Sequence, residues 1–191
     1  MVWLATWNIN SVNAHLSQLL EFIAKYNPDI LLLQETKTED HKFPYHALPG
    51  YYVSHLGQKT YNGVAILSKF PIQNVITNFA HNPSPEQARF IQADIAFSNT
   101  LLRVVNLYVP NGSEVGSDKF QLKLAFFASL INYLNQLDLS VATILGGDFN
   151  VAPFEIDVHS PEKLKNRILF SLPERSVMRT LLNYKWFDIY R

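Results

Sequence analysis

The sequence predicts an α/β fold in which two mixed β-sheets pack against each other and helices lie outside them. The first reason is composition. Hydrophobic residues make up 48% of the 191 residues and charged residues only 17%, against a charged share of about 25% in typical globular proteins. The second reason is that strand-like segments outnumber helical ones, and several follow one another without a helix between them. A doubly wound parallel sheet needs a helix between successive strands, so two packed sheets bury this composition better.

Eight segments have the apolar runs or the period-two alternation of strands. They are Val2–Asn8, Asp29–Gln34, Tyr51–His55, Gly63–Ser68, Ile72–Phe79, Phe90–Phe97, Leu101–Val109 and Val141–Gly147. The run Ile30–Leu33 has no polar face, which indicates a strand buried on both sides. In Phe90–Phe97 an apolar face alternates with a more polar one. The hairpin-like neighbours Gly63–Ser68 and Ile72–Phe79 favour antiparallel or mixed sheets.

Three segments have helical patterns. A first helix carries Leu16, Leu19, Leu20 and Ile23, with Asn13 as its expected N-cap and Asn27-Pro28 at its end. The clearest helix runs from about Ser117 to Asp138, where an apolar stripe recurs at spacings of three and four. The stripe consists of Phe120, Leu124, Phe127, Ile131 and Leu134. A further helix is expected over Ser176–Asn183, after Pro173.

Length and charge limit the classes of protein that fit. A chain of 191 residues fits one domain, 1–191, which can bury roughly 70% of its unfolded surface. Lys and Arg (16) balance Asp and Glu (16), so any phosphate-binding surface must be local. The chain has no cysteine, which excludes disulfides and cysteine-based zinc sites. No signal peptide is recognisable and no apolar run approaches the ~20 residues of a membrane helix, so a cytoplasmic location is expected. The oligomeric state is open, with a monomer favoured.

Three apolar runs end in polar groups suited to metal and phosphate, which predicts a shared centre at strand ends. They are Thr6–Asn10, Leu31–Thr36 and Ile144–Asn150. Glu35 is either a solvated strand-end carboxylate or a ligand of Mg²⁺, which prefers hard oxygen ligands. Asp148 and Asn150 are either turn residues or a carboxylate that accepts a proton from water with an amide that orients it. Alternation along an extended chain would put these two side chains on the same side.

Further candidates are polar residues at strand ends. Asn8 and Asn10 follow the first strand and would share a side by the same alternation. Tyr108 is either a half-buried aromatic residue with a solvated hydroxyl or a phenol that donates to a phosphate oxygen. Arg89 is either a solvated charge or a phosphate clamp. The six histidines form no i,i+4 pair or tight cluster, so each is expected at the surface.

Five motifs occur together in one order and spacing. They are Trp7–Asn10, Leu33–Lys37, Tyr61–Lys69, Asn106–Gly112 and Gly147–Asn150. Together they resemble exodeoxyribonuclease III, the bacterial abasic-site endonuclease family of the endonuclease/exonuclease/phosphatase superfamily. The resemblance extends over the whole chain, and the Tyr-Val-Pro-Asn-Gly segment at 108–112 points to this family within the superfamily.

The resemblance implies a four-layered αββα sandwich of two mixed sheets with outer helices. It implies Mg²⁺-dependent cleavage of double-stranded DNA beside abasic sites, with trimming of 3′ ends in base excision repair; Mn²⁺ is an alternative metal. Carried over residue by residue, Glu35 and Asn8 would hold the metal, and Tyr108, Asp148 and Asn150 would be catalytic. Arg89, Asn10 and Asn111 would contact DNA or phosphate.

Members of the family are longer, by what the resemblance implies. The additional part carries a further Asp-bearing strand and a terminal Ser-Asp-His segment, so this chain is expected to lack C-terminal strands and to have impaired activity. Supplying that segment in trans is expected to restore function. The alternatives are a catalytically dead fragment, or half of a split protein, that binds DNA or a partner. A further alternative is a phosphoesterase of the same superfamily that acts on a non-DNA substrate.

Overall fold

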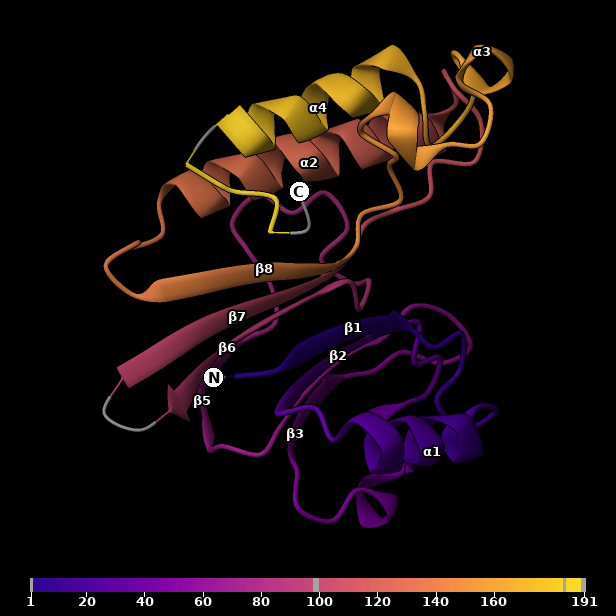
Figure 1. Ribbon diagram of the computed structural model, residues 1–191. Helices are drawn as coiled ribbons and strands as arrows, with labels where there is room; N and C mark the ends of the chain where they lie inside the picture. Colours follow the sequence, from indigo (N-terminus) through magenta and orange to yellow (C-terminus); the bar gives the residue numbers. More distant parts are fainter. Residues whose placement is uncertain (1, 98–99, 184, 190–191) are drawn as a thin grey trace. The chain divides into compact units, whose positions relative to one another are not determined.

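The computed structural model describes residues 2–97, 100–183 and 185–189 (Figure 1). Its contacts divide the chain into two units. The first comprises Met1–Asn78, Pro85–Tyr108 and Asp138–Asp148, and the second comprises Phe79–Ser84, Val109–Leu137 and Phe149–Arg191. Each unit is described by itself. The assignment of 1–191 to a single domain stays a prediction.

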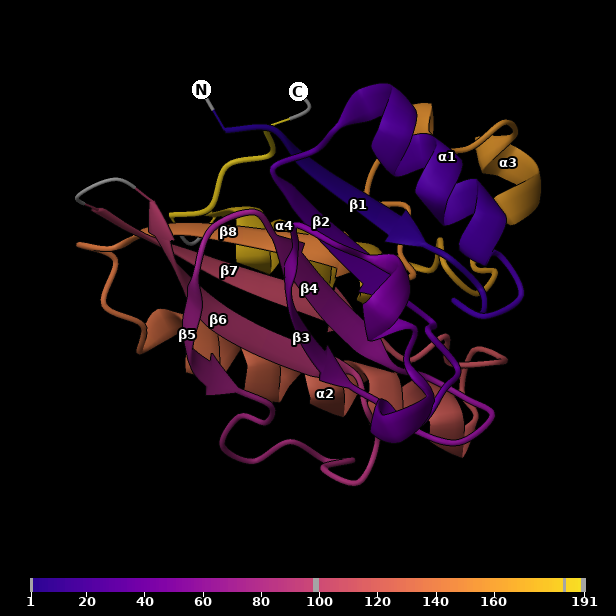
Figure 2. The same cartoon turned by 90° about the horizontal axis from the view of Figure 1, so that it is seen from below.

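The first unit contains two four-stranded sheets (Figure 2). The first sheet has the order β1-β2-β4-β3, in which only the β1–β2 pair is parallel. The second sheet has the order β5-β6-β7-β8, in which only the β7–β8 pair is parallel. The strands are β1 (Leu4–Asn8), β2 (Ile30–Gln34), β3 (Tyr52–Leu56), β4 (Val64–Ser68), β5 (Ile72–Ile76), β6 (Phe90–Phe97), β7 (Thr100–Tyr108) and β8 (Ala142–Asp148). Both sheets are therefore mixed, as the sequence predicts.

Strand β2 is buried on both faces, which confirms the prediction from its continuous apolar run. Ile30 and Leu32 pack between the two sheets, against residues such as Ile91 of β6. Leu31 and Leu33 belong to the core on the other face, together with Leu19 of the helix that follows β1. All six of these side chains are inaccessible to solvent, and each such burial contributes about 1.5–3 kcal/mol.

Helix α1 (Leu16–Tyr26) connects the parallel strands β1 and β2. It ends where the sequence predicts: Asn27 has a left-handed conformation and its N–H donates to the Ile23 carbonyl, the usual way to close a helix C-terminus. The prediction of Asn13 as N-cap is wrong. Residue His15 precedes the first turn, and the Asn13 amide donates instead to Thr38 Oγ1 at 3.1 Å. Two short 3₁₀ turns, Asp40–Lys42 and Tyr45–Ala47, follow β2.

The second unit is helical. It contains α2 (Asp118–Asn135), α3 (Pro161–Leu164), α4 (Leu172–Asn183) and a 3₁₀ turn at Glu155–Asp157. Ser117 caps α2 by accepting from the Phe120 N–H at 3.2 Å. The apolar stripe predicted for α2 is only partly right, because Leu124 and Ile131 are half-buried. The buried face of α2 includes Lys123, Phe126 and Leu130 instead.

One strand prediction needs correction. Segments Gly63–Ser68 and Ile72–Phe79 do not form a hairpin, since β4 pairs with β2 and β3 whereas β5 pairs with β6. The more polar face predicted for Phe90–Phe97 is buried. Asp94 on that face is 5% exposed and accepts from Arg103 Nε at 3.0 Å, so a buried ion pair replaces water there. Within the described ranges, no helix is both long and apolar enough to cross a membrane.

Candidate functional site

The ends of three strands meet at the side chain of Asn8. Its Nδ2 donates to Glu35 Oε1 at 2.7 Å and to Asp148 Oδ2 at 2.8 Å. Asn8 ends β1, Glu35 directly follows β2, and Asp148 ends β8. The structure therefore brings together the polar endings that the sequence singles out. One amide group holds two carboxylates within a few ångströms of each other.

Unusual backbone conformations present the two carboxylates. Glu35 has φ +52° and Lys37 has φ +51°, so the chain leaves β2 through left-handed turns. Such residues cost of order 1–3 kcal/mol each and concentrate at functional sites. On the other strand, Gly147 has φ +127°, and a Cβ there would collide with the backbone of Leu107. This glycine lets β8 lie close to β7 immediately before Asp148.

Lys37 makes an ion pair with the outer oxygen of Glu35, with 2.8 Å between Nζ and Oε2. Burial by itself would raise the pKa of Glu35. Hydrogen bonds from Asn8, Lys37 and Tyr108 and the charge of Lys37 outweigh it, so the pKa lies below its usual value. Glu35 is therefore ionised at neutral pH. Lys37 ends the motif Leu33–Lys37, and its position two residues after Glu35 is the sequence signal that could have indicated this ion pair.

Asn10 belongs to the same group of side chains, but for a different reason than predicted. Its backbone has φ +49°, so it does not continue the alternation of β1. Instead its N–H donates to Asn8 Oδ1 at 3.2 Å, and its own Oδ1 accepts from Lys37 Nζ. These contacts fix the amide of Asn8 with its Nδ2 towards the carboxylates.

Tyr108 ends β7 and lies between Glu35 and Arg89. Burial raises the pKa of the Tyr108 phenol to about 12, and its hydrogen bond to Glu35 and the charge of Glu35 act in the same direction. The phenol therefore stays protonated and can donate. The Arg89 guanidinium stacks on the Tyr108 ring at 4.7 Å, and its Nη1 donates to the Tyr108 carbonyl at 3.2 Å. Arg89 is thus not a freely solvated charge.

A buried polar network that the sequence analysis missed connects β7 to β2 and β4. The Asn106 Nδ2 donates to the carbonyls of Leu33 at 2.9 Å and Ala65 at 2.8 Å, and its Oδ1 accepts from Gln34 Nε2 at 2.7 Å. Gln34 also donates to Thr6 Oγ1. Asn106 is two residues from Tyr108 and Gln34 adjoins Glu35, so the network fixes the strands that carry both. Gln34 and Asn106 both lie within the motifs, and this is the sequence signal that could have indicated the network.

Replacement of Asn106 by alanine is expected to destabilise the protein by about 3 kcal/mol or more. It leaves the Gln34 amide and two buried carbonyls without this partner, and each unsatisfied buried group costs about 1–3 kcal/mol. Urea unfolding measures the effect. Gln73→Ala, at an exposed position of β5, serves as the control and should change stability by less than about 0.5 kcal/mol. Equal unfolding midpoints for the two variants would contradict the role of the network.

His55 contradicts the expectation that the histidines lie at the surface. Its side chain is fully buried. Nε2 lies 2.8 Å from Thr36 Oγ1, and Nδ1 lies 2.9 Å from Asp40 Oδ1. Burial lowers the pKa of His55 to about 4, although Asp40 acts in the opposite direction. The imidazole is therefore neutral and supports the turn that follows Glu35.

Protein stability is expected to fall between pH 6.5 and pH 4. As the pH falls, the His55 imidazole takes up its proton at a higher pH in the unfolded chain than in the folded protein. Its contribution is therefore complete above the unfolded pKa of about 6.5 and is lost as the pH falls towards the folded value. The loss can reach about 3 kcal/mol. Urea unfolding at pH 7.5 and pH 5 should show a smaller difference for His55→Gln than for wild type, while the exposed-site control His41→Gln should retain it. A His55→Gln protein with the wild-type pH dependence would refute the assignment.

Asn111 and Asn150 belong to the second unit. The Asn150 Nδ2 donates to the Val109 carbonyl at 2.9 Å, and Asn111 Nδ2 lies 3.4 Å from Asn150 Oδ1. Strand β8 ends at Asp148, and Asn150 has φ +50°. The predicted alternation of Asp148 and Asn150 along one extended strand is therefore wrong, because the chain turns between them.

The residues at Asn8 suit a divalent cation with hard oxygen ligands. Glu35 and Asp148 provide two carboxylates that accept from the same Nδ2 group of Asn8, while Asn8 Oδ1 accepts from the Asn10 N–H. Mg²⁺ is usually held by one or two carboxylates with water and substrate phosphate oxygens. Among the described residues there is no cluster of three or more His, Cys, Asp or Glu that could form a complete protein cage. The donor set therefore fits Mg²⁺ shared with a phosphate group.

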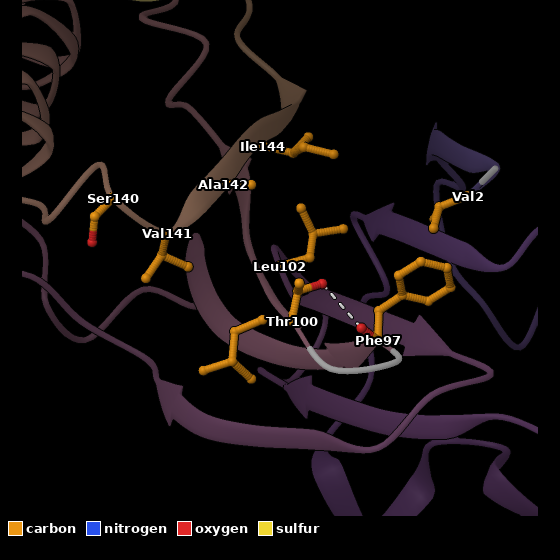
Figure 3. A pocket seen from close by; sticks show the side chains of 9 residues that line it. Val2, Phe97, Thr100, Leu102, Ser140, Val141, Ala142 and Ile144 are labelled. Carbon is orange, nitrogen blue, oxygen red and sulfur yellow. Dashed lines mark hydrogen bonds between the residues drawn. The ribbon is translucent and has the colours of Figure 1, made fainter.

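An apolar cavity of about 660 Å³ lies at the opposite ends of β1 and β8 (Figure 3). Its lining includes Val2 before β1, Phe97 of β6, Leu102 of β7 and Ile144 of β8. Among the residues that the structure describes, none of the side chains that line it is ionisable. It adjoins β1 and β8, and each of these is an edge strand of its own sheet.

The chain is similar to known proteins over almost its whole length. The model of the endonuclease/exonuclease/phosphatase family matches residues 5–190. Exodeoxyribonuclease III of Haemophilus influenzae is 35% identical over 196 residues, which cover 97% of this chain and 73% of that protein.

Two solved structures are also similar. An AP endonuclease from Archaeoglobus fulgidus has a TM-score of 0.94 at 38% identity, covering 100% of this chain and 74% of that one. The Neisseria 3′ phosphatase NExo, bound to product DNA hairpin, has a TM-score of 0.89 at 38% identity, covering 96% of this chain and 71% of that one. These likenesses confirm an α/β fold with two mixed sheets and helices. With the match of the family model over almost the whole chain, they show that this chain belongs to the endonuclease/exonuclease/phosphatase family and, within it, to the hydrolases of the exodeoxyribonuclease III and AP endonuclease type that act in DNA repair.

Proposed function

We propose that the protein is a Mg²⁺-dependent DNA phosphodiesterase that cleaves beside abasic sites and trims 3′ ends. The observation that carries the proposal is the pair of carboxylates, Glu35 and Asp148, held together by the amide of Asn8. Two anionic groups this close would favour the binding of a divalent cation, which is commonly held by carboxylates together with phosphate oxygens. Mn²⁺ could replace Mg²⁺ in the same donor set.

Each residue of the site has a chemical task in this proposal. Glu35 and Asn8 would hold the metal, which supplies a positive charge to the scissile phosphate. Asp148 accepts a proton from the attacking water, because a carboxylate in hydrogen-bond reach of water can act as a general base. Tyr108 donates to a phosphate oxygen, since its raised pKa keeps the phenol protonated. Asn150 orients the water or the phosphate.

Double-stranded DNA is the proposed partner. The structural relative NExo is described as bound to a product DNA hairpin and as a 3′ phosphatase, which supports action on 3′ ends. Arg89, Asn10 and Asn111 are proposed to supply a cation and amides that contact the DNA backbone. The net charge of zero makes this contact local. A cytoplasmic location, with access to DNA, is part of the proposal.

Full activity is proposed to need an additional strand-forming segment. The edge strands β1 and β8 border the apolar cavity, and unpaired edge strands present free backbone groups for pairing. The chain also spans only 73% of the H. influenzae exodeoxyribonuclease III. We infer that a segment such as the unmatched part of that relative, supplied in trans, would cover these edges.

Glu35→Ala is expected to weaken Mg²⁺ binding by at least ten-fold. The substitution removes one of the two carboxylates at Asn8 and leaves Lys37 without its anionic partner, so a cation meets both fewer ligands and an unpaired ammonium. Isothermal titration calorimetry with MgCl₂ measures the change. Glu21→Ala, which removes an exposed carboxylate on α1, is the matched control and should bind as wild type does. Identical affinities for the Glu35→Ala and wild-type proteins would remove Glu35 as a ligand.

The proposed function is tested with a 5′-labelled duplex that contains one abasic site. The protein should produce a single cut beside that site in the presence of Mg²⁺ and none in EDTA. A matched duplex with a recessed 3′ end tests the trimming activity. Cleavage that is unchanged in EDTA would refute the metal-dependent mechanism. Hydrolysis of a non-DNA phosphoester without any action on DNA would favour the alternative substrate class.

A further inference from the structure

An ion pair with no exposed surface lies inside the second unit and has no part in the chemistry at Asn8. Lys123 of α2 and Glu174 of α4 are both 0% exposed, and Lys123 Nζ donates to Glu174 Oε1. A buried ion pair adds little net stability compared with apolar residues of the same volume, since desolvation offsets the attraction. Lys123 and Glu174 must therefore act through the groups that they contact.

The ammonium of Lys123 holds the two loops that carry the candidate amides. It donates to the carbonyl of Asn150 at 2.6 Å and to the carbonyl of Asn111 at 3.1 Å. An ammonium group has three donors, and these three contacts match them. Asn150 has a left-handed backbone conformation, with φ +50°. This conformation is strained for a residue other than glycine, so the hydrogen bond from Lys123 helps to hold it.

The carboxylate of Glu174 fixes the position of Lys123. Its Oε1 also accepts from the Leu169 N–H at 3.1 Å, and its Oε2 accepts from the Ser171 N–H at 3.1 Å and the Ser171 hydroxyl at 2.6 Å. Both oxygens are therefore fully engaged. The Leu169 carbonyl in turn accepts from the Ala152 N–H at 2.8 Å, so the loop after Asn150 is tied to the same segment.

Close packing prevents the ammonium from moving away from these carbonyls. Gly112 lies directly after Asn111 in a left-handed turn, and a Cβ at Gly112 would lie 3.1 Å from Lys123 Cδ. The lysine stem thus fills the space under this turn. A longer or branched side chain would displace the turn and with it the Asn111 amide.

We propose that Lys123 and Glu174 are positioning residues, which set the orientation of the Asn150 and Asn111 side chains by holding their backbone carbonyls from within the second unit. The inference rests on the proposed function, in which these amides contact the water or the phosphate. It assigns catalytic importance to a pair that cannot itself touch DNA, since neither side chain is exposed.

The test is the double variant Lys123→Met/Glu174→Gln. Methionine has a similar length without charge, and glutamine keeps one carbonyl oxygen that can accept from Ser171, so no unpaired buried charge remains, although the Leu169 N–H loses its acceptor. The single variant Lys123→Met leaves Glu174 as such a charge and should melt much lower. The double variant should recover most of the melting temperature but should lack the donor to both carbonyls. Lys163→Met, at an exposed lysine of α3, is the control.

The decisive readout is the side-chain amide spectrum of protein labelled with ¹⁵N-asparagine. In the folded double variant the signals assigned to Asn150 and Asn111 should shift or broaden, while those of Asn8 should not. Cleavage should fall at least ten-fold in kcat with little change in KM. In an Asn150→Ala background the double variant should add a smaller loss than it causes in wild type, because only the Asn111 amide then remains to be displaced.

The outcomes separate this inference from the proposed function. Unchanged Asn150 and Asn111 signals in the folded double variant overturn the positioning role, whether or not the protein cleaves DNA. Shifted signals in a protein without nuclease activity support the positioning role while they count against the proposed function. A double variant that cannot be recovered in folded form assigns the pair to folding and also overturns the inference.

Discussion

The chain alone is expected to cleave an abasic-site duplex at least 100-fold more slowly than H. influenzae exodeoxyribonuclease III, and to recover much of this difference with the unmatched part of that enzyme in trans. The reason is the charge that develops on the phosphate during displacement. At the Asn8 site the charged groups are two carboxylates, Lys37, which is paired with Glu35, and Arg89, which stacks on the ring of Tyr108. Removing one positioned donor from a transition state typically costs ~10²–10³-fold.

The apolar cavity supplies a second, structural reason. A segment that covered the cavity and the edges of β1 and β8 would bury apolar surface at about 25 cal/mol per Å². A few hundred Å² would therefore add several kcal/mol, a large fraction of a domain stability of about 5–15 kcal/mol. The added segment should raise the cooperative melting temperature as well as the rate.

These two effects can be separated by experiment. A folded chain with low activity shows a cooperative melt without cleavage, whereas a poorly folded chain shows neither. The trans segment with its sequence scrambled is the control and should change neither property. If the purified chain cleaves as fast as the H. influenzae enzyme, no additional segment is needed and the prediction is wrong.

The part of the site that sequence could predict consists of residues at strand ends. Asn8, Glu35 and Asp148 could be predicted because each ends or follows an apolar run. Sites in α/β folds form at the carboxyl ends of the strands. The predicted side-chain alternation is wrong for Asn10 and Asn150. Both have a left-handed backbone, and alternation applies only to an extended chain. Their functional roles, like those of Tyr108, Arg89 and Asn111, stay predictions.

The residues that sequence reasoning missed depend on partners far away in the chain. Asn106 is joined to Gln34, 72 residues away, and His55 to Thr36, 19 residues away. Local patterns contain no information about such pairs. The same limit explains the fold errors: β4 and β5 are neighbours in sequence but pair in different sheets. The more polar face of β6 was predicted but its burial was not, because Asp94 is paired with Arg103 on another strand.

Asp148→Asn is expected to lower the cleavage rate by about 10³-fold while DNA binding changes little. The amide replaces a carboxylate that can accept a proton, and a general base typically contributes 10²–10⁴-fold; a 10³-fold loss corresponds to about 4 kcal/mol in the barrier. The geometry should survive, because the asparagine oxygen can still accept from Asn8 Nδ2 as Asp148 Oδ2 does at 2.8 Å. The variant also removes a negative charge close to Glu35, so its melting temperature should not fall.

The measurement compares single-turnover cleavage with DNA affinity under whichever condition gives a measurable wild-type rate, with or without the trans segment. Asp118→Asn removes an exposed carboxylate at the start of α2 and controls for the change in net charge. Tyr108→Phe is a useful contrast. It removes one phosphate donor but leaves the base, so its loss should be smaller and should not steepen the pH dependence below pH 8. An Asp148→Asn protein that retains the wild-type rate would show that this carboxylate does not activate the water, and the chemistry at Asn8 would then have to rest on Glu35 and the metal alone.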